Sequence, residues 1–155
     1  MRISWVEESA VSCGAIPISI ENLEALKEQG VSAIVTLTEH PLTSQKALTS
    51  EAIADMGFET LHVPVVDQHP PTEEQVQRVL DFVQQMKGKQ KPVYLHCHAG
   101  IGRTGTMLHA IYLLSGMEFE TVKQRIKTTR PASQFFMLSE TQQAFLEKLA
   151  EKPRA

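Results

Sequence analysis

The sequence predicts a single α/β domain, with a mostly parallel central β-sheet flanked by helices. Short apolar segments rich in β-branched residues alternate along the chain with longer amphipathic segments, which is typical of parallel strands joined by helices. A length of 155 residues suits one domain, and no linker, repeat or low-complexity stretch divides it. We therefore treat residues 1–155 as one unit, with residues 151–155 as a frayed tail.

Five segments have the composition of short buried strands, separated by Gly, Pro or polar residues. The expected strands are residues 3–6, 11–16, 31–37, 58–66 and 92–97. The last of them leads directly into a glycine-containing loop.

Six further segments have apolar residues at helical spacing. Ser19 could cap the first helix, and Thr72 with Gln75 has the form of a capping box at the start of the third. The fourth helix is apolar all round, which predicts burial on every side. The expected helices run from Ser19 to Gly30, over 44–56, over 72–87, after Thr104 as far as Gly116, over a segment with Phe119, Val122 and Ile126 that ends before Arg130, and over one with Leu138, Phe145, Leu146 and Leu149.

The segment from Val93 to Thr106 carries the strongest chemical signal. It consists of a strand, a glycine-containing loop and a helix, an order that aims backbone N–H groups and a helix N-terminus at an anion. Cys97 ends the strand, and its thiolate form would be the nucleophile. Arg103, six positions later, offers a planar fork for two phosphate oxygens, and Thr104 can offer its hydroxyl to the sulfur. These residues predict attack on a phosphoryl group.

We expect the backbone N–H groups of this loop to surround the phosphate. The residues concerned are His98, Ala99, Gly100, Ile101, Gly102 and Arg103. A zinc site is not expected, because side chains alternate along a strand, so Cys97 and its neighbours His96 and His98 face opposite ways. The chain also has no second Cys/His pair with zinc spacing, so we expect neither a metal nor a cofactor.

The string His96-Cys97, five residues and Arg103-Thr104 resembles the active-site signature of cysteine-based protein tyrosine phosphatases. The wider match is to small atypical dual-specificity enzymes of Cdc14-like and DUSP23-like type, with looser similarity through residues 3–6, 36–39 and 130–131. The resemblance implies the dual-specificity phosphatase fold and metal-independent hydrolysis through a phosphocysteine intermediate. It makes phosphotyrosine in proteins the leading substrate, with phosphoserine and phosphothreonine as further ones.

Cleavage of a phosphate ester requires a positioned acid to protonate the leaving oxygen. Asp55 and Asp81 lie on expected helices, whereas Asp67 lies in a loop just past a strand. In a mostly parallel sheet this strand end faces the same side as the Cys97 loop. The resemblance agrees, because the family's general-acid aspartate lies on a mobile loop about this far before the cysteine.

Two alternatives stay open for this loop. Asp67 could only stabilise the turn before Pro70 and Pro71, since Asp is common in turns. Two extra residues separate Pro64 from Asp67 compared with the family's commonest pattern, so the loop could hinge differently. His69 is then the alternative acid.

The resemblance assigns supporting roles to two more residues. The histidine that matches His96 organises the loop and helps to hold the thiolate. Gln142 falls on the apolar stripe of the last helix, where family members place a glutamine that positions the hydrolytic water. Ser139 and Gln142 equally form a capping box, so both roles stay open for Gln142. Gln143 is expected to point outward and is the weaker candidate.

Bulk properties limit the partners and the compartment. A formal charge of −3 argues against general affinity for nucleic acid, and no apolar run approaches the roughly 18 residues of a membrane span. The N-terminus turns acidic where a signal peptide is apolar, and two cysteines are too few for a disulfide framework. We expect a reduced, cytoplasmic monomer that acts on a phosphorylated protein. A basic helix face, either solvated or attractive to phosphorylated partners, comprises Lys123, Arg125, Lys127 and Arg130.

Three other functions remain as alternatives. The substrate could be a non-protein phosphomonoester such as a phosphoinositide or a nucleotide, although His98 and Ile101 stand where phosphoinositide-type relatives use lysines. A rhodanese-like sulfurtransferase also uses a cysteine in an anion-binding loop, but it would not need Asp67. A pseudophosphatase would bind phosphate without chemistry, and the intact Cys97 and Arg103 argue against it.

Overall fold

A five-stranded sheet with the order β1-β2-β5-β3-β4 forms the centre of the computed structural model, which describes residues 1–152. Three short 3-10 turns interrupt the connections: η1 (Leu42–Ser44), η2 (Pro131–Ser133) and η3 (Phe135–Met137). The strands and helices, in chain order, are β1 (Ser4–Glu7), β2 (Val11–Gly14), α1 (Ile20–Glu28), β3 (Ala33–Thr36), α2 (Ser50–Asp55), β4 (Glu59–His62), α3 (Glu73–Gly88), β5 (Val93–His96), α4 (Gly102–Leu114), α5 (Phe119–Thr129) and α6 (Glu140–Glu151).

The sheet is parallel except for its first strand. β2, β5, β3 and β4 run in the same direction, and β1 pairs antiparallel with β2. β5 is the central strand, and its four residues are all buried, as expected for a strand with parallel neighbours on both sides and helices on both faces. The predicted α/β fold with a mostly parallel sheet is confirmed.

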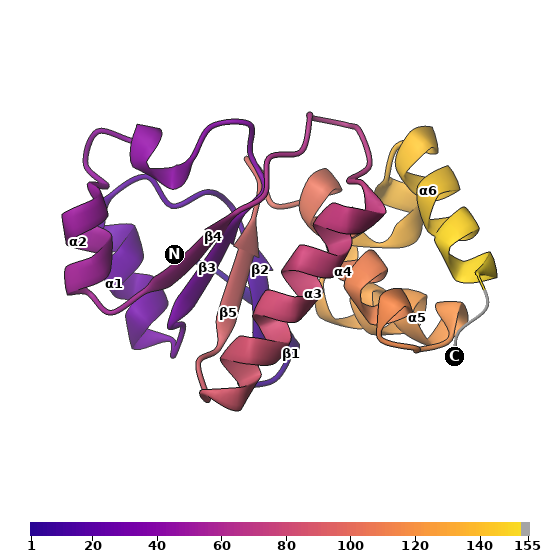
Figure 1. Cartoon of the computed structure of the whole chain (residues 1–155), viewed down its shortest axis with the longest axis horizontal. Helices are drawn as coiled ribbons and strands as arrows, with labels where there is room; N and C mark the ends of the chain where they lie inside the picture. The colour runs from indigo at the N-terminus through magenta and orange to yellow at the C-terminus, as the bar shows by residue number, and fades with distance from the viewer. Residues whose placement is uncertain (153–155) are drawn as a thin grey trace.

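Helices cover both faces of this sheet. Figure 1 shows α1 and α2 on one face and α3 to α6 on the other. Because neighbouring side chains of a strand point to opposite faces, Tyr94 packs into the core under α1 and α2, whereas Leu95 packs into the larger core under α3 to α6. Within α4, every residue from Arg103 to Leu113 is buried, as its apolar composition predicted.

Side-chain caps fix the beginnings of four helices. Ser19 and Thr49 accept from backbone N–H groups three residues ahead, at the starts of α1 and α2. Complete capping boxes begin α3, with Thr72 and Gln75, and α6, with Ser139. The caps predicted at Ser19 and Thr72 are confirmed.

Several expected boundaries are wrong. The helix expected over 44–56 begins only at Ser50, because Thr49 caps it and the preceding residues form a turn around the buried Leu48. The strand expected over 58–66 is confined to Glu59–His62, after which the chain turns away into a loop. Leu138 precedes α6 instead of belonging to it. The expected frayed tail is helical at Glu151, and residues 153–155 lie outside the described part of the chain.

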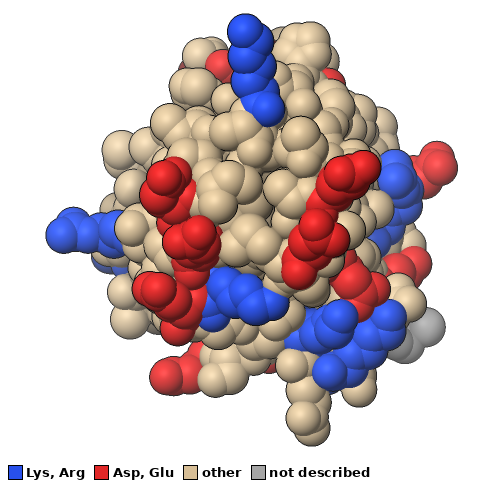
Figure 2. Space-filling view, turned by 90° about the vertical axis from the view of Figure 1, so that its left-hand side faces the viewer, with Lys and Arg blue, Asp and Glu red and all other residues tan. Residues whose placement is uncertain are grey.

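The outer face of α1 and α2 carries both signs of charge. In Figure 2, blue and red side chains are interspersed with broad neutral areas on this face, without a continuous basic surface. No helix among residues 1–152 is long and apolar enough to cross a bilayer. Over the same residues, no group of three or more His, Cys, Asp or Glu side chains is arranged to hold a metal ion.

Candidate active site

Four loops meet at one edge of the sheet, where β2, β3, β4 and β5 end. The carboxyl ends of parallel strands share an edge, so residues far apart in sequence come together there. Asp67 and Arg103 therefore line the same groove, as predicted. This groove has a volume of about 310 Å³ and is lined by Ile16, Thr38, Glu39, His40, Ser44, Gln45, Asp67, His98 and Arg103.

The anion loop, residues 97–103, connects β5 to the first turn of α4. Its carbonyl oxygens accept hydrogen bonds from donors outside the loop. The bonds run from the Ile16 N–H to His98 (3.0 Å), from Arg130 Nη2 to Gly100 (2.8 Å) and from Ser133 Oγ to Ile101 (2.9 Å). By contrast, no backbone N–H of residues 98–103 donates a hydrogen bond within the described chain. These free N–H groups, with the positive end of the α4 dipole, form an anion-binding arrangement.

Gly100 allows the loop its shape. Its φ of +75° lies in the left-handed region, and a Cβ built there would lie 2.1 Å from the Gly14 carbonyl oxygen. The loop therefore passes against the end of β2 at a distance that only glycine permits.

His96, the residue before the cysteine, is fully buried. Burial lowers its pKa to about 4, so the ring is neutral at pH 7. The Cys97 carbonyl can only accept, so His96 Nδ1–H donates to it (2.9 Å), and Nε2 accepts from the Thr36 hydroxyl (2.8 Å). A neutral histidine thus fixes the backbone of the cysteine from inside the sheet.

Arg103 lies buried between three loops, with 5% of its side chain exposed. Its Nη1 donates to Glu39 Oε1 (2.6 Å) and to the Val65 carbonyl (3.0 Å). Its Nε is 3.6 Å from Asp67 Oδ1 and has no hydrogen-bond partner in the described residues. Hydrogen bonds from its own amide and from Arg103 hold the pKa of the Glu39 carboxyl below its ordinary value, so Glu39 is a stable anionic partner.

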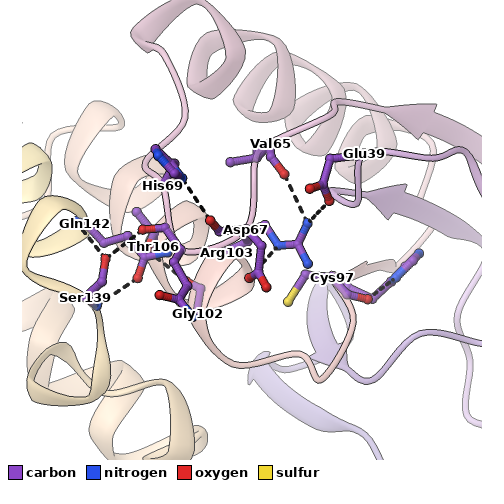
Figure 3. Close-up of polar contacts among 12 residues, drawn as sticks. Glu39, Val65, Asp67, His69, Cys97, Gly102, Arg103, Thr106, Ser139 and Gln142 are labelled. Atoms are coloured by element: carbon purple, nitrogen blue, oxygen red, sulfur yellow. Dashed lines mark hydrogen bonds and ion pairs between the residues drawn. The ribbon is translucent and has the colours of Figure 1, made fainter.

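Asp67, and not His69, approaches Arg103. The Asp67 side chain is 68% exposed, and its carboxylate extends toward the guanidinium. In Figure 3 the Cys97 sulfur and the Asp67 carboxylate both point to the space beside Arg103. The His69 ring instead donates from Nδ1 to the Asp67 carbonyl (2.8 Å), so it stabilises the turn formed by residues 67–69.

The sequence model of the family described as "Polymorphic toxin system, DSP-PTPase phosphatase" matches residues 11–117, which is more than half of the chain. The chain belongs to this phosphatase family. This family agrees with the resemblance to dual-specificity phosphatases seen in the sequence.

Two curated relatives and one solved structure illustrate the likeness. The chain is 30% identical over 124 residues to dual specificity protein phosphatase CDC14A of Homo sapiens, covering 79% of this chain and 18% of that protein. It is 28% identical over 108 residues to phosphatidylglycerophosphatase and protein-tyrosine phosphatase 1 of Homo sapiens, covering 69% and 53%. The chain thus spans about half or less of these relatives. Tk-PTP in its active form has the same fold, with a TM-score of 0.81, 23% identity and 97% of both chains covered.

In this protein, two of the expected supporting residues have unpaired buried atoms. The Thr104 hydroxyl is buried without a hydrogen-bond partner, and no bond joins it to Cys97. Gln142 is 1% exposed, and its Oε1 accepts from the Ser139 N–H, which completes the capping box. Its Nε2 is unpaired and faces the anion loop, 3.5 Å from where a Cβ on Gly102 would lie. The capping box is therefore confirmed for Gln142, and its role in positioning water stays a prediction.

The expectation that Gln143 points outward is wrong. It is partly buried, and its Nε2 donates to the carbonyl oxygens of Phe135 (3.2 Å) and Leu138 (3.1 Å). Those carbonyls lie at the start of η3 and just past its end, before α6 begins, so the donor comes from the following helix. Gln143 therefore stabilises the segment that leads into α6.

Sequence reasoning missed the roles of Glu39 and Arg130. Glu39 follows β3, the strand next to β5, so its place at the shared sheet edge was a usable signal. Arg130 is not simply part of a solvated basic face, because Nη2 donates to the Gly100 carbonyl and Nη1 to Ser4 Oγ (3.2 Å). No local sequence pattern predicts that contact, because it joins residues 30 positions apart.

We expect the stability of this protein to fall in mild acid. Burial lowers the pKa of His96 and of His109 to about 4 from an ordinary 6.5. Between pH 6.5 and 4 the unfolded chain binds protons that the folded chain excludes, so the free energy of unfolding drops as pH falls, by up to about 1.4 kcal/mol per pH unit for each histidine. Urea unfolding from pH 7.5 to 4.5 measures this slope. His109→Gln should roughly halve it, and an unchanged slope would contradict the assignment.

Gly100→Ala should distort the anion loop. The new Cβ meets the backbone of Gly14, which cannot rotate away, so we expect lower thermal stability and loss of vanadate binding by calorimetry. Gly116→Ala is the matched control, because Gly116 also has positive φ (+104°) but no neighbour within 4 Å of the added Cβ. That variant should lose only about 1–2 kcal/mol of folding stability, which is the cost of a side chain in the left-handed backbone region. Equal stability of the two variants, with vanadate binding retained, would contradict the close approach.

Proposed function

We propose that the protein hydrolyses phosphate monoesters through a phosphocysteine intermediate, with phosphotyrosine in proteins as the leading substrate. The observation that carries the proposal is the meeting of Asp67 and Arg103, 3.6 Å apart, beside the loop that begins with Cys97. This arrangement supplies an acid, an anion-binding fork and a nucleophile in one groove.

In the first step, the Cys97 thiolate attacks phosphorus, and an S–P bond forms as the P–O bond to the leaving group breaks. The free N–H groups of residues 98–103 and Arg103 stabilise the equatorial oxygens. Glu39 and Val65 occupy Arg103 Nη1, so Nε and Nη2 form the fork for phosphate oxygens. Asp67 gives its proton to the leaving oxygen.

In the second step, water attacks the phosphocysteine. Asp67, now a carboxylate, accepts a proton from the water, and the S–P bond breaks to return the thiolate and release phosphate. Unpaired groups are available to assist on two sides. The Gln142 amide would orient the water, and the Thr104 hydroxyl would stabilise the departing sulfur.

The second cysteine is unsuited to this chemistry. Cys13 is fully buried on β2, and burial raises the pKa of its thiol to about 11. Cys97, at the head of the anion loop, is therefore the nucleophile. Both cysteines are free thiols, which supports our proposal of a reduced, cytoplasmic protein.

The groove supports a protein substrate. Polar side chains, with His40 and His98 among them, line most of it, which supports a phosphorylated peptide as the substrate. We include phosphoserine and phosphothreonine as further substrates, as the resemblance to dual-specificity enzymes implies.

A lipid phosphate is the second candidate. Exposed apolar side chains lie on the anion loop, at Ile101, and on the neighbouring η3 turn, at Phe136 and Met137, with exposures of 37%, 82% and 60%. The name of one human relative joins phosphatidylglycerophosphatase with protein-tyrosine phosphatase activity. Comparing hydrolysis of phosphotyrosine peptides with that of phosphatidylglycerophosphate in mixed micelles separates the two candidates.

The test of the mechanism is hydrolysis of para-nitrophenyl phosphate across pH, without added metal. Cys97→Ser should reduce turnover to background, because it removes the nucleophile. Asp67→Asn should reduce kcat by about 10²–10⁴-fold and remove the basic limb of the pH profile, because no protonated acid remains to titrate.

Other outcomes would redirect the assignment. Full activity of Asp67→Asn would make His69 the acid, with His69→Gln as the next variant. Vanadate binding without turnover in the wild type would identify a phosphate-binding module and contradict the enzyme. Thiosulfate turnover without phosphatase activity would identify a sulfurtransferase.

A further inference from the structure

The acid loop, residues 64–71, has its sharpest bend directly after Asp67. Gln68 has a φ of +64°, in the left-handed region that non-glycine residues disfavour. Such a conformation persists when surrounding contacts determine it, and it sets the direction of the Gln68 carbonyl. The contacts of this carbonyl therefore contribute to where the neighbouring Asp67 is held.

Two hydroxyl groups of the segment that begins α6 donate to that carbonyl. Ser139 Oγ lies 2.9 Å and Thr141 Oγ1 lies 3.2 Å from the Gln68 oxygen. The two hydroxyls are also 3.2 Å from each other. A single acceptor thus joins the acid loop to the beginning of α6.

The first half of the acid loop is held by different partners. Gln75 Nε2 donates to the Pro64 carbonyl (2.8 Å), and Arg103 donates to the Val65 carbonyl. Beyond Asp67, a hollow of about 600 Å³ separates Pro70 from the outer side of α6. Packing is therefore loose on that side, and within residues 1–152 the hydrogen bonds between this loop and α6 are those to Gln68.

Asp67 itself has little support from its side chain. Its carboxylate is 68% exposed, and its nearest ionic partner is Arg103 Nε at 3.6 Å, which is too long for a hydrogen bond. The backbone of the loop must therefore place the carboxylate. The Asp67 carbonyl accepts from His69 within the same turn, and the Gln68 carbonyl is the next anchor, to a different element, so the two hydroxyls act on Asp67 through one peptide unit.

We propose that Ser139 and Thr141 are positioning residues that latch the acid loop over the anion loop. The same turn of α6 carries Gln142, whose amide faces Gly102, so one rigid element sets both the acid and the amide proposed to orient water. This inference rests on the proposed function, because the latch affects catalysis only if Asp67 is the general acid.

The experiment uses Thr141→Val and Ser139→Asp, alone and combined. Valine keeps the shape of threonine without its hydroxyl. Aspartate keeps the acceptor that caps α6 but cannot donate to Gln68. With phenyl phosphate, a poor leaving group, we expect kcat to fall by about 3- to 10-fold for each variant. With para-nitrophenyl phosphate, whose leaving group needs less protonation, we expect a smaller loss.

Two controls separate positioning from general destabilisation. Ser19→Ala removes the equivalent cap from α1, where Ser19 has no hydrogen bond to the acid loop in the described chain, and should leave both substrates unaffected. In an Asp67→Asn background, Thr141→Val should cause no further loss, because the group that the latch positions is gone.

Contrary results distinguish the two hypotheses. An equal loss on both substrates, or a loss that persists in the Asp67→Asn background, overturns the latch. Unchanged rates of the latch variants, with Asp67→Asn impaired, overturn the latch and leave the proposed function intact. Full activity of Asp67→Asn overturns the acid assignment, and the latch falls with it.

Discussion

A guanidinium buried at the edge of a sheet must find acceptors, and Arg103 finds them in loops that follow two different strands. Glu39 comes after β3, and the Val65 carbonyl comes after β4. Removing water from a charged group costs free energy unless partners replace that water, so these contacts hold the loops in place as much as they hold the arginine. The positions of the acid loop and of the groove therefore depend on this one buried cation.

The order of the strands makes this convergence possible. β5 is central, with β3 and β2 as its neighbours, so the anion loop emerges between the loops of both. The β2 side supplies the Gly14 backbone that Gly100 approaches, and the β3 side supplies Glu39. A helix that begins where β5 ends then directs its free N–H groups to the same point. The fold and the site follow from one topological arrangement.

The sequence predicted the parts whose causes are local. Strand and helix alternation, the caps at Ser19 and Thr72, the anion loop and the position of Asp67 past a strand end all rest on short patterns. The contacts of Arg130 with Gly100 and of Ser139 with Gln68 join residues far apart in sequence, and their geometry depends on loops whose course no propensity fixes. The predicted start of α2 was too early, because the Thr49 side chain caps the helix although the apolar spacing continues before it.

The groups left unpaired explain what the site is organised to receive. Buried polar atoms normally have partners, and leaving one unpaired costs roughly 1–3 kcal/mol. Three such atoms, Arg103 Nε, Thr104 Oγ1 and Gln142 Nε2, belong to the first turn of α4 or to the side chain that faces it. All three can donate, as can the free N–H groups of the anion loop, and an anion with several oxygens would satisfy them together. A surplus of donors that is unfavourable in the folded chain becomes favourable when an anion binds, and under the proposed mechanism it stabilises most the state in which charge is spread over the equatorial oxygens.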